Sequence, residues 1–203
     1  MKIIEGLEQG SDEWKSWRKT KITATSAAIL MGNNPWNKPI DLYNEIFGLI
    51  PPKESNAAMA RGTALEPEAR QAFIDKMGID MIPIVCEHEE YPWMAASLDG
   101  WNEDNKAILE CKAPNEKTHF MAIEGNIPEY YRDQIIHQLA VTGGKVCYYV
   151  SYRPEYKINL AIVEVYPNIG YMQTMIETEK QFYEECMLTM TPPKPDWKLN
   201  LKE

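Results

Sequence analysis

The chain has 203 residues, of which 44% are hydrophobic and 25% charged, and its formal net charge is −9. This length and composition are typical of one globular domain with a full core. No apolar run reaches the roughly 18 residues that a membrane span needs. The first residues lack the apolar stretch of a secretory signal, so we expect a cytoplasmic protein.

The four cysteines are scattered along the chain, at Cys86, Cys111, Cys147 and Cys186. No two of them form a C-x-x-C pair, and no cysteine–histidine cluster exists, which argues against structural zinc or an iron–sulfur centre. Cys111 and Cys147 lie in apolar runs that are typical of strands, so we expect them to be buried free thiols.

The acidic balance of the chain is unusual for a protein that binds nucleic acid, but it does not exclude one. Affinity for nucleic acid depends on local phosphate contacts rather than on total charge. The segment from Lys15 to Lys21 forms a local basic patch. Two interpretations stay open, namely a basic channel on an otherwise acidic exterior and an ordinary acidic cytoplasmic enzyme.

The chain begins with helices and then alternates strands with helices. A short helix capped by Ser11 runs through Trp17, and further helices are predicted over 25–31, 39–47 and 56–77. Strands follow over 80–85, 93–98 and 106–112, with Asp99-Gly100 as a turn between the last two. The remaining elements are helices over 116–124 and 128–142, strands over 145–152 and 157–165, and a helix over 168–190.

This order predicts an α/β (α+β) fold with a central mixed sheet that helices flank. We expect a single domain over 1–203, with its core over about 10–190 and an extended tail over 191–203.

The most informative pattern is Asp99-Gly100 followed by Glu110-Cys111-Lys112. Strand periodicity puts Ile108, Glu110 and Lys112 on one face, where a buried carboxylate and ammonium need partners. Asp99 and Glu110 could bind Mg²⁺, with the carbonyl of Cys111 as a further ligand, while Lys112 orients the attacking water. The alternatives are an ordinary Asp-Gly turn and an exposed strand face with an ion pair.

Two helices offer further polar side chains. Glu66 could bind the same metal directly or through a water, with Arg70 one turn along as its partner, or it could lie on a solvated helix face. Gln134 and Gln138 share a helix face, where a glutamine could hold a catalytic water. The alternative is that both are surface residues, and this alternative is stronger for Gln138.

Arg18 precedes the hydroxyl pair Thr25-Ser26 at the start of a predicted helix. Hydroxyls at a helix N-terminus beside a cation are suited to binding a phosphate. The alternative is helix capping beside a solvated basic face.

An acid followed by a strand that bears Glu-x-Lys resembles the PD-(D/E)xK nucleases, and the order of all the motifs resembles the lambda-exonuclease/YqaJ group of phage recombination nucleases. The resemblance spans about Gly10 to Tyr166 and includes five stretches. They are Glu13–Arg18 with Ile22-Thr23-Ala24, Arg61-Gly62-Thr63 with Glu66, Ser97–Gly100, Leu109–Lys112, and Tyr131–Gln138 with Ala140–Gly143.

The resemblance implies a restriction-endonuclease-like core and a role for each matched residue. Asp99 and Glu110 would be the metal-binding acids, Lys112 the catalytic lysine and Glu66 the helix glutamate, while Arg18 and Thr25 would hold a terminal 5′-phosphate. The family usually has serine at the position of Thr25, so Ser26 is the alternative hydroxyl. It commonly has Gln-x-Gln in the helix, where Ile136 stands second here, which leaves Gln134 to position the water.

The chain is therefore interpreted as a Mg²⁺-dependent 5′→3′ exonuclease on linear double-stranded DNA. It would release 5′-mononucleotides and leave 3′ overhangs for phage-type recombination. The resemblance implies two Mg²⁺ ions or Mn²⁺ in their place, a homotrimer, a phage single-strand annealing protein as partner, and residence in the host cytoplasm if a phage carries the gene. A restriction or repair endonuclease with the same site and an inactive DNA-binding module are the alternatives.

Overall fold

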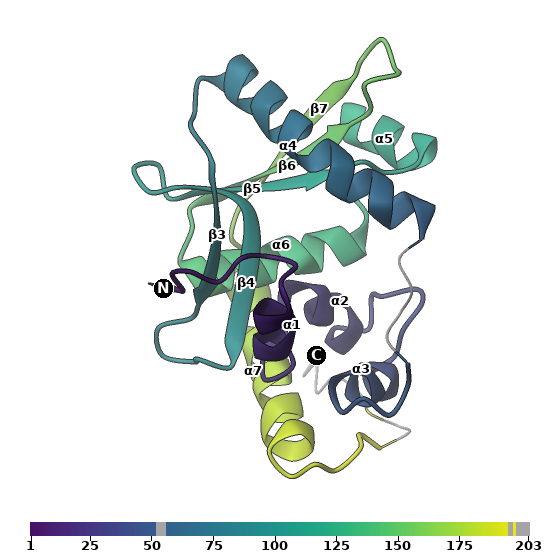
Figure 1. Ribbon diagram of the computed structural model, residues 1–203, viewed down its shortest axis with the longest axis vertical. Coiled ribbons are helices and arrows are strands. Elements are labelled where there is room, and N and C mark those ends of the chain that lie inside the picture. The colour runs from purple at the N-terminus through teal and green to yellow at the C-terminus, as the bar shows by residue number, and fades with distance from the viewer. Residues whose placement is uncertain (52–55, 195–196, 198–203) are drawn as a thin grey trace.

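The computed structural model describes residues 1–51, 56–194 and 197 (Figure 1). The strands are β1 (Lys2–Ile3), β2 (Ile22–Thr23), β3 (Ile82–Glu87), β4 (Met94–Asn102), β5 (Ala107–Lys112), β6 (Val146–Tyr152) and β7 (Leu160–Val165). The helices are α1 (Asp12–Arg18), α2 (Ala24–Leu30), α3 (Pro39–Ile46), α4 (Ala57–Met77), α5 (Glu116–Ile123), α6 (Glu129–Thr142) and α7 (Ile169–Phe182), which a π-helical turn, η1 (Tyr183–Met187), extends.

One sheet joins all of these strands, in the order β1-β3-β4-β5-β6-β7, with β2 paired to β4. The pairs β5–β6 and β2–β4 are parallel and the other pairs are antiparallel. The crossover between β5 and β6 carries α5 and α6, as a parallel pair requires. The predicted mixed sheet with flanking helices is confirmed.

Helices cover the sheet unequally on its two sides. One core cluster packs α4 on β5 and β6 through Phe73, Leu109 and Val150. A larger cluster packs α2, α6 and α7 on the opposite side, and α5 also lies there (Figure 1). Within the described residues, no helix is both long enough and apolar enough to cross a membrane.

The predicted alternation of β5 is confirmed, because its successive side chains enter different cores. Ile108 packs in the cluster around α6, whereas Leu109 and Cys111 pack in the cluster around α4. Glu110 consequently points to the α6 side, where its hydrogen-bond partners lie. Cys111 and Cys147 are buried free thiols, as predicted.

The prediction of a turn at Asp99-Gly100 is wrong. β4 continues through both residues to Asn102, with Gly100 paired to Leu109 of β5. Gly100 is required for close packing rather than for turning, because a Cβ there would lie 2.7 Å from the Cβ of Met81 and 3.0 Å from that of Leu109. The chain reverses after Asn102 instead, where Lys106 adopts a φ of 51°.

Other boundaries differ from the sequence prediction by a few residues. β3 starts two residues later than expected and runs on to Glu87, because the backbone of Glu87 pairs with Lys2 of β1 and Ala95 of β4. β7 starts at Leu160 rather than 157, and the last helix becomes π-helical at Tyr183. The two-residue strands β1 and β2 were not predicted, because two residues show no alternation. Of the expected tail, only 191–194 and Trp197 lie within the described residues.

Candidate active site

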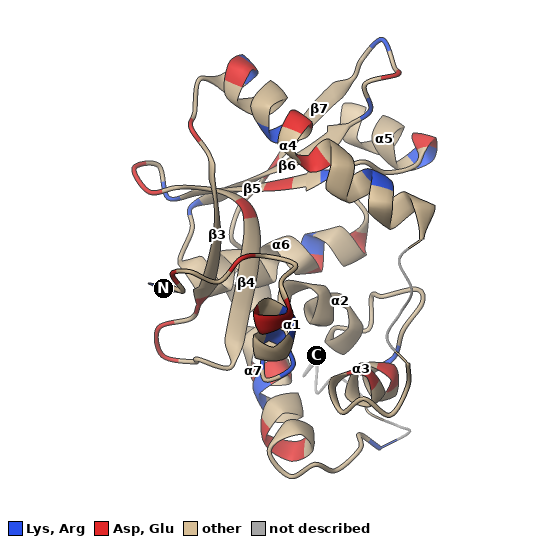
Figure 2. Cartoon of the chain, viewed as in Figure 1, with Lys and Arg blue, Asp and Glu red and all other residues tan. Residues whose placement is uncertain are grey.

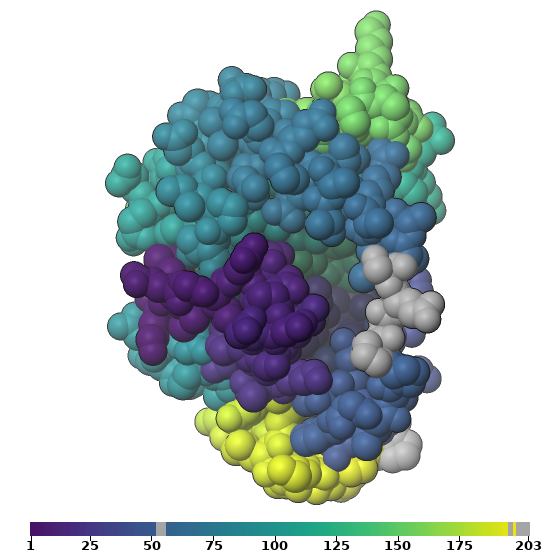
Figure 3. Space-filling model, in the orientation of Figure 1, coloured from purple at the N-terminus to yellow at the C-terminus, as the bar shows by residue number. Residues whose placement is uncertain are grey.

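The polar residues singled out in the sequence meet around one cleft of about 250 Å³. Figure 3 shows a hollow between α4 and the N-terminal helices on this face of the molecule. Its lining includes the five predicted catalytic residues, Glu66, Asp99, Glu110, Lys112 and Gln134. It also includes Arg18, Thr25 and Cys111. Ser26 is not part of the lining, and its buried hydroxyl lies 3.4 Å from that of Thr23, which does line the cleft.

The carboxylate of Glu110 is the centre of this cleft. It is only 2% exposed, yet three side chains donate to it. Lys112 forms an ion pair with Oε1, Gln134 Nε2 donates to Oε1 at 2.6 Å, and Gln138 Nε2 donates to Oε2 at 2.6 Å. Such donors make a buried carboxylate tolerable. One residue of β5 and two residues of α6 therefore stabilise a single buried carboxylate.

Asp99 places a second carboxylate beside Glu110. Its Oδ2 accepts a hydrogen bond from the backbone N–H of Cys111 at 2.7 Å. Burial raises the pKa of Asp99 well above its usual value, and the carboxylates of Glu110 and Glu66 raise it further, against the opposing effect of Lys112. Two buried carboxylates that repel each other form a place where a cation would be stabilised.

The lysine remains a cation in this setting. Burial by itself would lower the pKa of Lys112, but the carboxylates of Glu110 and Asp99 raise it above its ordinary value. The ammonium also lies over the ring of Tyr131, with Nζ 5.3 Å from the ring centroid. Lys112 is therefore suited to stabilising negative charge and not to accepting a proton.

Helix α4 brings Glu66 to the rim of the cleft. Arg70 Nη1 donates to Glu66 at 3.1 Å, as the spacing predicted, and also to the backbone carbonyl of Asp99 at 2.6 Å. Arg70 thus connects α4 to the strand that carries Asp99. Arg70 also forms an ion pair with one carboxylate oxygen of Glu66. Asp99 forms no ion pair with any described residue.

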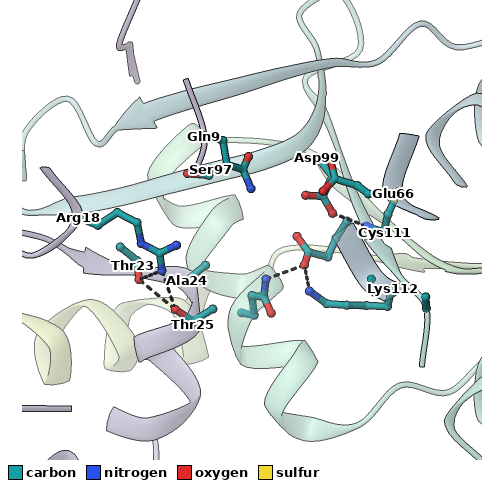
Figure 4. A pocket seen from close by; sticks show the side chains of 14 residues that line it. Gln9, Arg18, Thr23, Ala24, Thr25, Glu66, Ser97, Asp99, Cys111 and Lys112 are labelled. Atoms are coloured by element: carbon teal, nitrogen blue, oxygen red, sulfur yellow. Dashed lines mark hydrogen bonds and ion pairs between the residues drawn. The ribbon is translucent and has the colours of Figure 1, made fainter. Parts of the chain in front are cut away.

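Arg18 lies at the other end of the cleft, across from the acids (Figure 4). Its Nη2 donates to the hydroxyls of Thr23 at 3.3 Å and Thr25 at 3.2 Å, and its guanidinium stacks 4.3 Å from the ring of Trp14. In the described part of the chain Arg18 has no ion pair. Figure 2 shows blue at the end of α1, whose first turn is acidic. An unpaired, fixed guanidinium is suited to binding an anion.

Sequence reasoning underestimated Gln138 and missed Ser97. Gln138 is fully buried on Glu110, and its spacing of four residues from Gln134 was the signal that could have assigned both glutamines to this site. Ser97 lines the cleft and shares a strand face with Asp99 two residues on, so strand periodicity could also have found it. Gln9 lines the cleft without any sequence signal.

His137 fixes the helix that carries the two glutamines. Its Nε2 donates to the carbonyl of Ala95 in β4 at 3.0 Å, and its Nδ1 lies 2.8 Å from Glu179 Oε1 in α7. Burial lowers the pKa of His137, but Glu179 and the Ala95 carbonyl raise it overall. α6 is thereby attached to both neighbouring elements, so its glutamines keep their positions.

The donors at the acidic end fit a hard divalent cation. Mg²⁺ prefers oxygen ligands and commonly takes only one or two carboxylates while keeping several waters. Asp99, Glu110 and the carbonyl of Cys111 offer such a set. Among residues 1–51, 56–194 and 197, no group of three or more His, Cys, Asp or Glu side chains could enclose a metal ion. Two carboxylates and a carbonyl match the small number of protein ligands that Mg²⁺ takes.

The sequence matches a family model and two named relatives. The model describes a YqaJ-like viral recombinase domain and matches residues 13–145. The uncharacterized protein YqaJ of Bacillus subtilis (strain 168) is 32% identical over 144 residues, which cover 70% of this chain and 45% of that protein. Protein R354 of Acanthamoeba polyphaga mimivirus is 26% identical over 161 residues, covering 72% and 29%. The chain spans less than half the length of these relatives.

Solved structures share the fold. An alkaline exonuclease, LHK-Exo, from Laribacter hongkongensis has a TM-score of 0.78 and 27% identity, over 89% of this chain and 94% of that one. The same protein in complex with dAMP has a TM-score of 0.77. A phage-related exonuclease from Haemophilus somnus 129PT has a TM-score of 0.59 at 14% identity, over 84% and 96% of the two chains, which shows the fold alone.

Replacing Gln138 by leucine removes one donor from the buried carboxylate of Glu110. We expect the free energy of unfolding to fall by about 1–3 kcal/mol, because a charged group loses a buried hydrogen bond. The measurement is urea denaturation at neutral pH. Gln173→Leu is the matched control, since Gln173 donates to Glu177 at 3.1 Å on an exposed helix face and its loss should cost less than about 0.5 kcal/mol. Equal small losses in both variants would contradict this description of the site.

Proposed function

Because the chain belongs to the YqaJ-like viral recombinase family, we propose that it is a metal-dependent exonuclease that degrades linear double-stranded DNA from its 5′ ends. It hydrolyses phosphodiester bonds, releases 5′-mononucleotides and leaves a 3′ single strand for phage-type recombination. The similarity to a structure named an alkaline exonuclease, and to its complex with dAMP, supports this choice of reaction and product.

The single observation that carries the proposal is the pair of buried carboxylates, Asp99 and Glu110, beside the half-buried ammonium of Lys112 in one cleft. Burying two carboxylates side by side in a protein is unfavourable unless each of them has partners. A hydrophobic core would be more easily built from apolar residues at these positions. A divalent cation and a scissile phosphate would be the missing partners of this cluster.

Mg²⁺ would be held by Asp99, Glu110 and the carbonyl of Cys111, with Glu66, whose carboxylate Arg70 already contacts, binding through a water. Two ions, or Mn²⁺ in their place, would fit the proposed chemistry. A bound divalent ion lowers the pKa of water and neutralises charge on the phosphate. The remaining parts of the reaction, which are charge stabilisation, water orientation and binding of the DNA end, depend on side chains of the protein.

Lys112 and Gln134 would act directly on the reacting groups. The ammonium of Lys112, kept protonated by the acids around it, would stabilise the negative charge that develops on the phosphate. Gln134 is fixed through its Nε2 by Glu110, which leaves its carbonyl oxygen to orient the attacking water. Gln138 is a positioning residue in this proposal, because it is buried behind Glu110.

Arg18 would bind the terminal 5′-phosphate, with the hydroxyl of Thr25 beside it. Both groups line the cleft at the end away from the acids, and their 3.2 Å hydrogen bond orients the guanidinium. Ser26, the alternative hydroxyl, lies outside the cleft lining and contacts the hydroxyl of Thr23 at 3.4 Å. A pocket for a terminal phosphate serves an enzyme that binds DNA ends, which favours an exonuclease over an endonuclease with the same acids.

Membership in the family also supports an inference about the oligomeric state and the protein partner. We infer a homotrimer, and a single-strand annealing protein that loads on the exposed 3′ strand. We infer that both would work in the cytoplasm of the host cell if a phage carries the gene. An endonuclease on the same site and an inactive DNA-binding module remain the competing functions.

Digestion of DNA with and without ends separates these functions. We expect the protein with Mg²⁺ to degrade end-labelled linear duplex while covalently closed circular duplex stays intact. Lys112→Ala should lower the rate about 10²- to 10³-fold, because the stabilising charge is lost. Lys145→Ala is the control, since Lys145 is exposed and outside the cleft. Cleavage of the circle would instead indicate an endonuclease, and no cleavage of either DNA would favour the binding module.

Arg18→Ala tests the end-binding pocket separately. The wild-type protein should degrade a 5′-phosphorylated duplex faster than a 5′-hydroxyl duplex, and the variant should lose about tenfold or more of this preference because a charge-assisted contact is removed. Initial rates on the two substrates give the ratio. Lys19→Ala removes the neighbouring exposed cation and should keep the preference. A preference that survives in Arg18→Ala would place the phosphate elsewhere.

A further inference from the structure

A run of aromatic rings leads from the surface of the protein to the cleft. Trp36, in the loop between α2 and α3, is 66% exposed. Its ring meets that of Tyr130 edge-on, with centroids 5.1 Å apart and planes at 67°. Tyr130 in turn contacts Tyr131, with centroids 4.5 Å apart. These three rings, at the start of α6 and in the loop beside it, are called the aromatic run below.

The inner end of the aromatic run contacts Lys112, which lines the cleft. The ring of Tyr131 lies under the ammonium of Lys112, at 5.3 Å. The outer end is therefore separated from the proposed catalytic lysine by only two tyrosine rings. A nucleic acid strand that passed Lys112 would meet these rings next.

Trp36 is held in place although its ring faces solvent. The side-chain Oδ1 of Asn34 accepts hydrogen bonds from the backbone N–H of Trp36 at 2.9 Å and of Asn37 at 2.8 Å. Asn33 Nδ2 donates to the buried carboxylate of Asp133 in α6 at 3.0 Å. The loop is thus attached to the helix that carries Tyr130, so the exposed indole is already in position and loses little conformational freedom on binding.

The charges beside the aromatic run are balanced. Lys38 and Arg132 are exposed and form no ion pair in the part of the chain that the structure describes. Glu129 lies next to Tyr130, and Asp41, in the first turn of α3, lies three residues after Lys38. Strong attraction for a duplex backbone would need an excess of cations. The exposed π face, rather than charge, is what this surface offers to a ligand.

We propose that Trp36, supported by Tyr130, stacks against a nucleobase of a single DNA strand that lies beside the cleft. Stacking on an aromatic side chain tolerates every base, since each base has a π face. The inference rests on the proposed function, because it takes DNA to be the substrate of the same cleft. A base stacked on Trp36 would be kept unpaired close to Lys112, which helps to separate the cut strand from its complement.

The test compares binding of a base-bearing single-stranded oligonucleotide with that of an abasic oligonucleotide of equal length and charge. Fluorescence anisotropy is measured in EDTA, where cleavage does not occur. The wild-type protein should prefer the base-bearing strand, and Trp36→Ala should lower the affinity for it about tenfold while leaving the abasic affinity unchanged. Trp36→Phe should keep part of the preference. Trp36→Leu, which retains apolar contact with Tyr130 but has no π face, should behave like the alanine variant.

Tyr166→Ala is the matched control, because Tyr166 is an aromatic residue of similar exposure, 61%, outside the cleft lining. It should bind both oligonucleotides as the wild type does. An undiminished preference in both Trp36→Ala and Trp36→Leu would overturn the inference, as would a wild-type protein with no preference for bases. The digestion of linear DNA is a separate readout, so failure of the stacking platform and failure of the nuclease proposal are distinguishable.

Discussion

The rest of the site depends on how the buried carboxylate of Glu110 is neutralised. Lys112 reaches it from the same strand, and Gln134 and Gln138 reach it from successive turns of α6. A carboxylate with 2% exposure would be strongly destabilising without these donors. This requirement fixes the side of β5 that faces α6. It also fixes the distance between helix and strand, and it leaves the second acid, Asp99, as the group most in need of an added cation.

The scaffold meets this requirement with three attachments. His137 connects α6 to β4 and α7, Arg70 connects α4 to the carbonyl of Asp99, and Gly100 lets β4 approach its neighbours closely. The contacts of His137 and Arg70 join elements that are distant in the sequence, whereas Gly100 brings consecutive strands together. The cleft is therefore a property of the whole sheet and its helices, and the aromatic run from Trp36 extends the same surface outward from α6.

Local patterns were enough to predict most elements and the main residues of the cleft. The two-residue period of β5 assigned Glu110 and Lys112 to one face, and Ser11 capped its helix as expected, accepting from the Trp14 N–H. The length of β4 could not be predicted, because an Asp-Gly pair favours a turn until strands pair on both of its sides. The four-residue spacing of Gln138 from Gln134 puts both on one helix face, but that Gln138 is fully buried depends on the packing of α6 against β5, which no local pattern shows.

The central claim is that Asp99 and Glu110 form a binding site for a divalent cation. Isothermal titration calorimetry with Mn²⁺ or Mg²⁺, in the absence of DNA, tests it most directly. Wild-type protein should bind the ion, and Glu110→Ala should bind it more than about tenfold more weakly, because a charged oxygen ligand is lost. Glu103→Ala, which removes an exposed acid outside the cleft, should leave binding unchanged. Undiminished binding in Glu110→Ala would contradict the account.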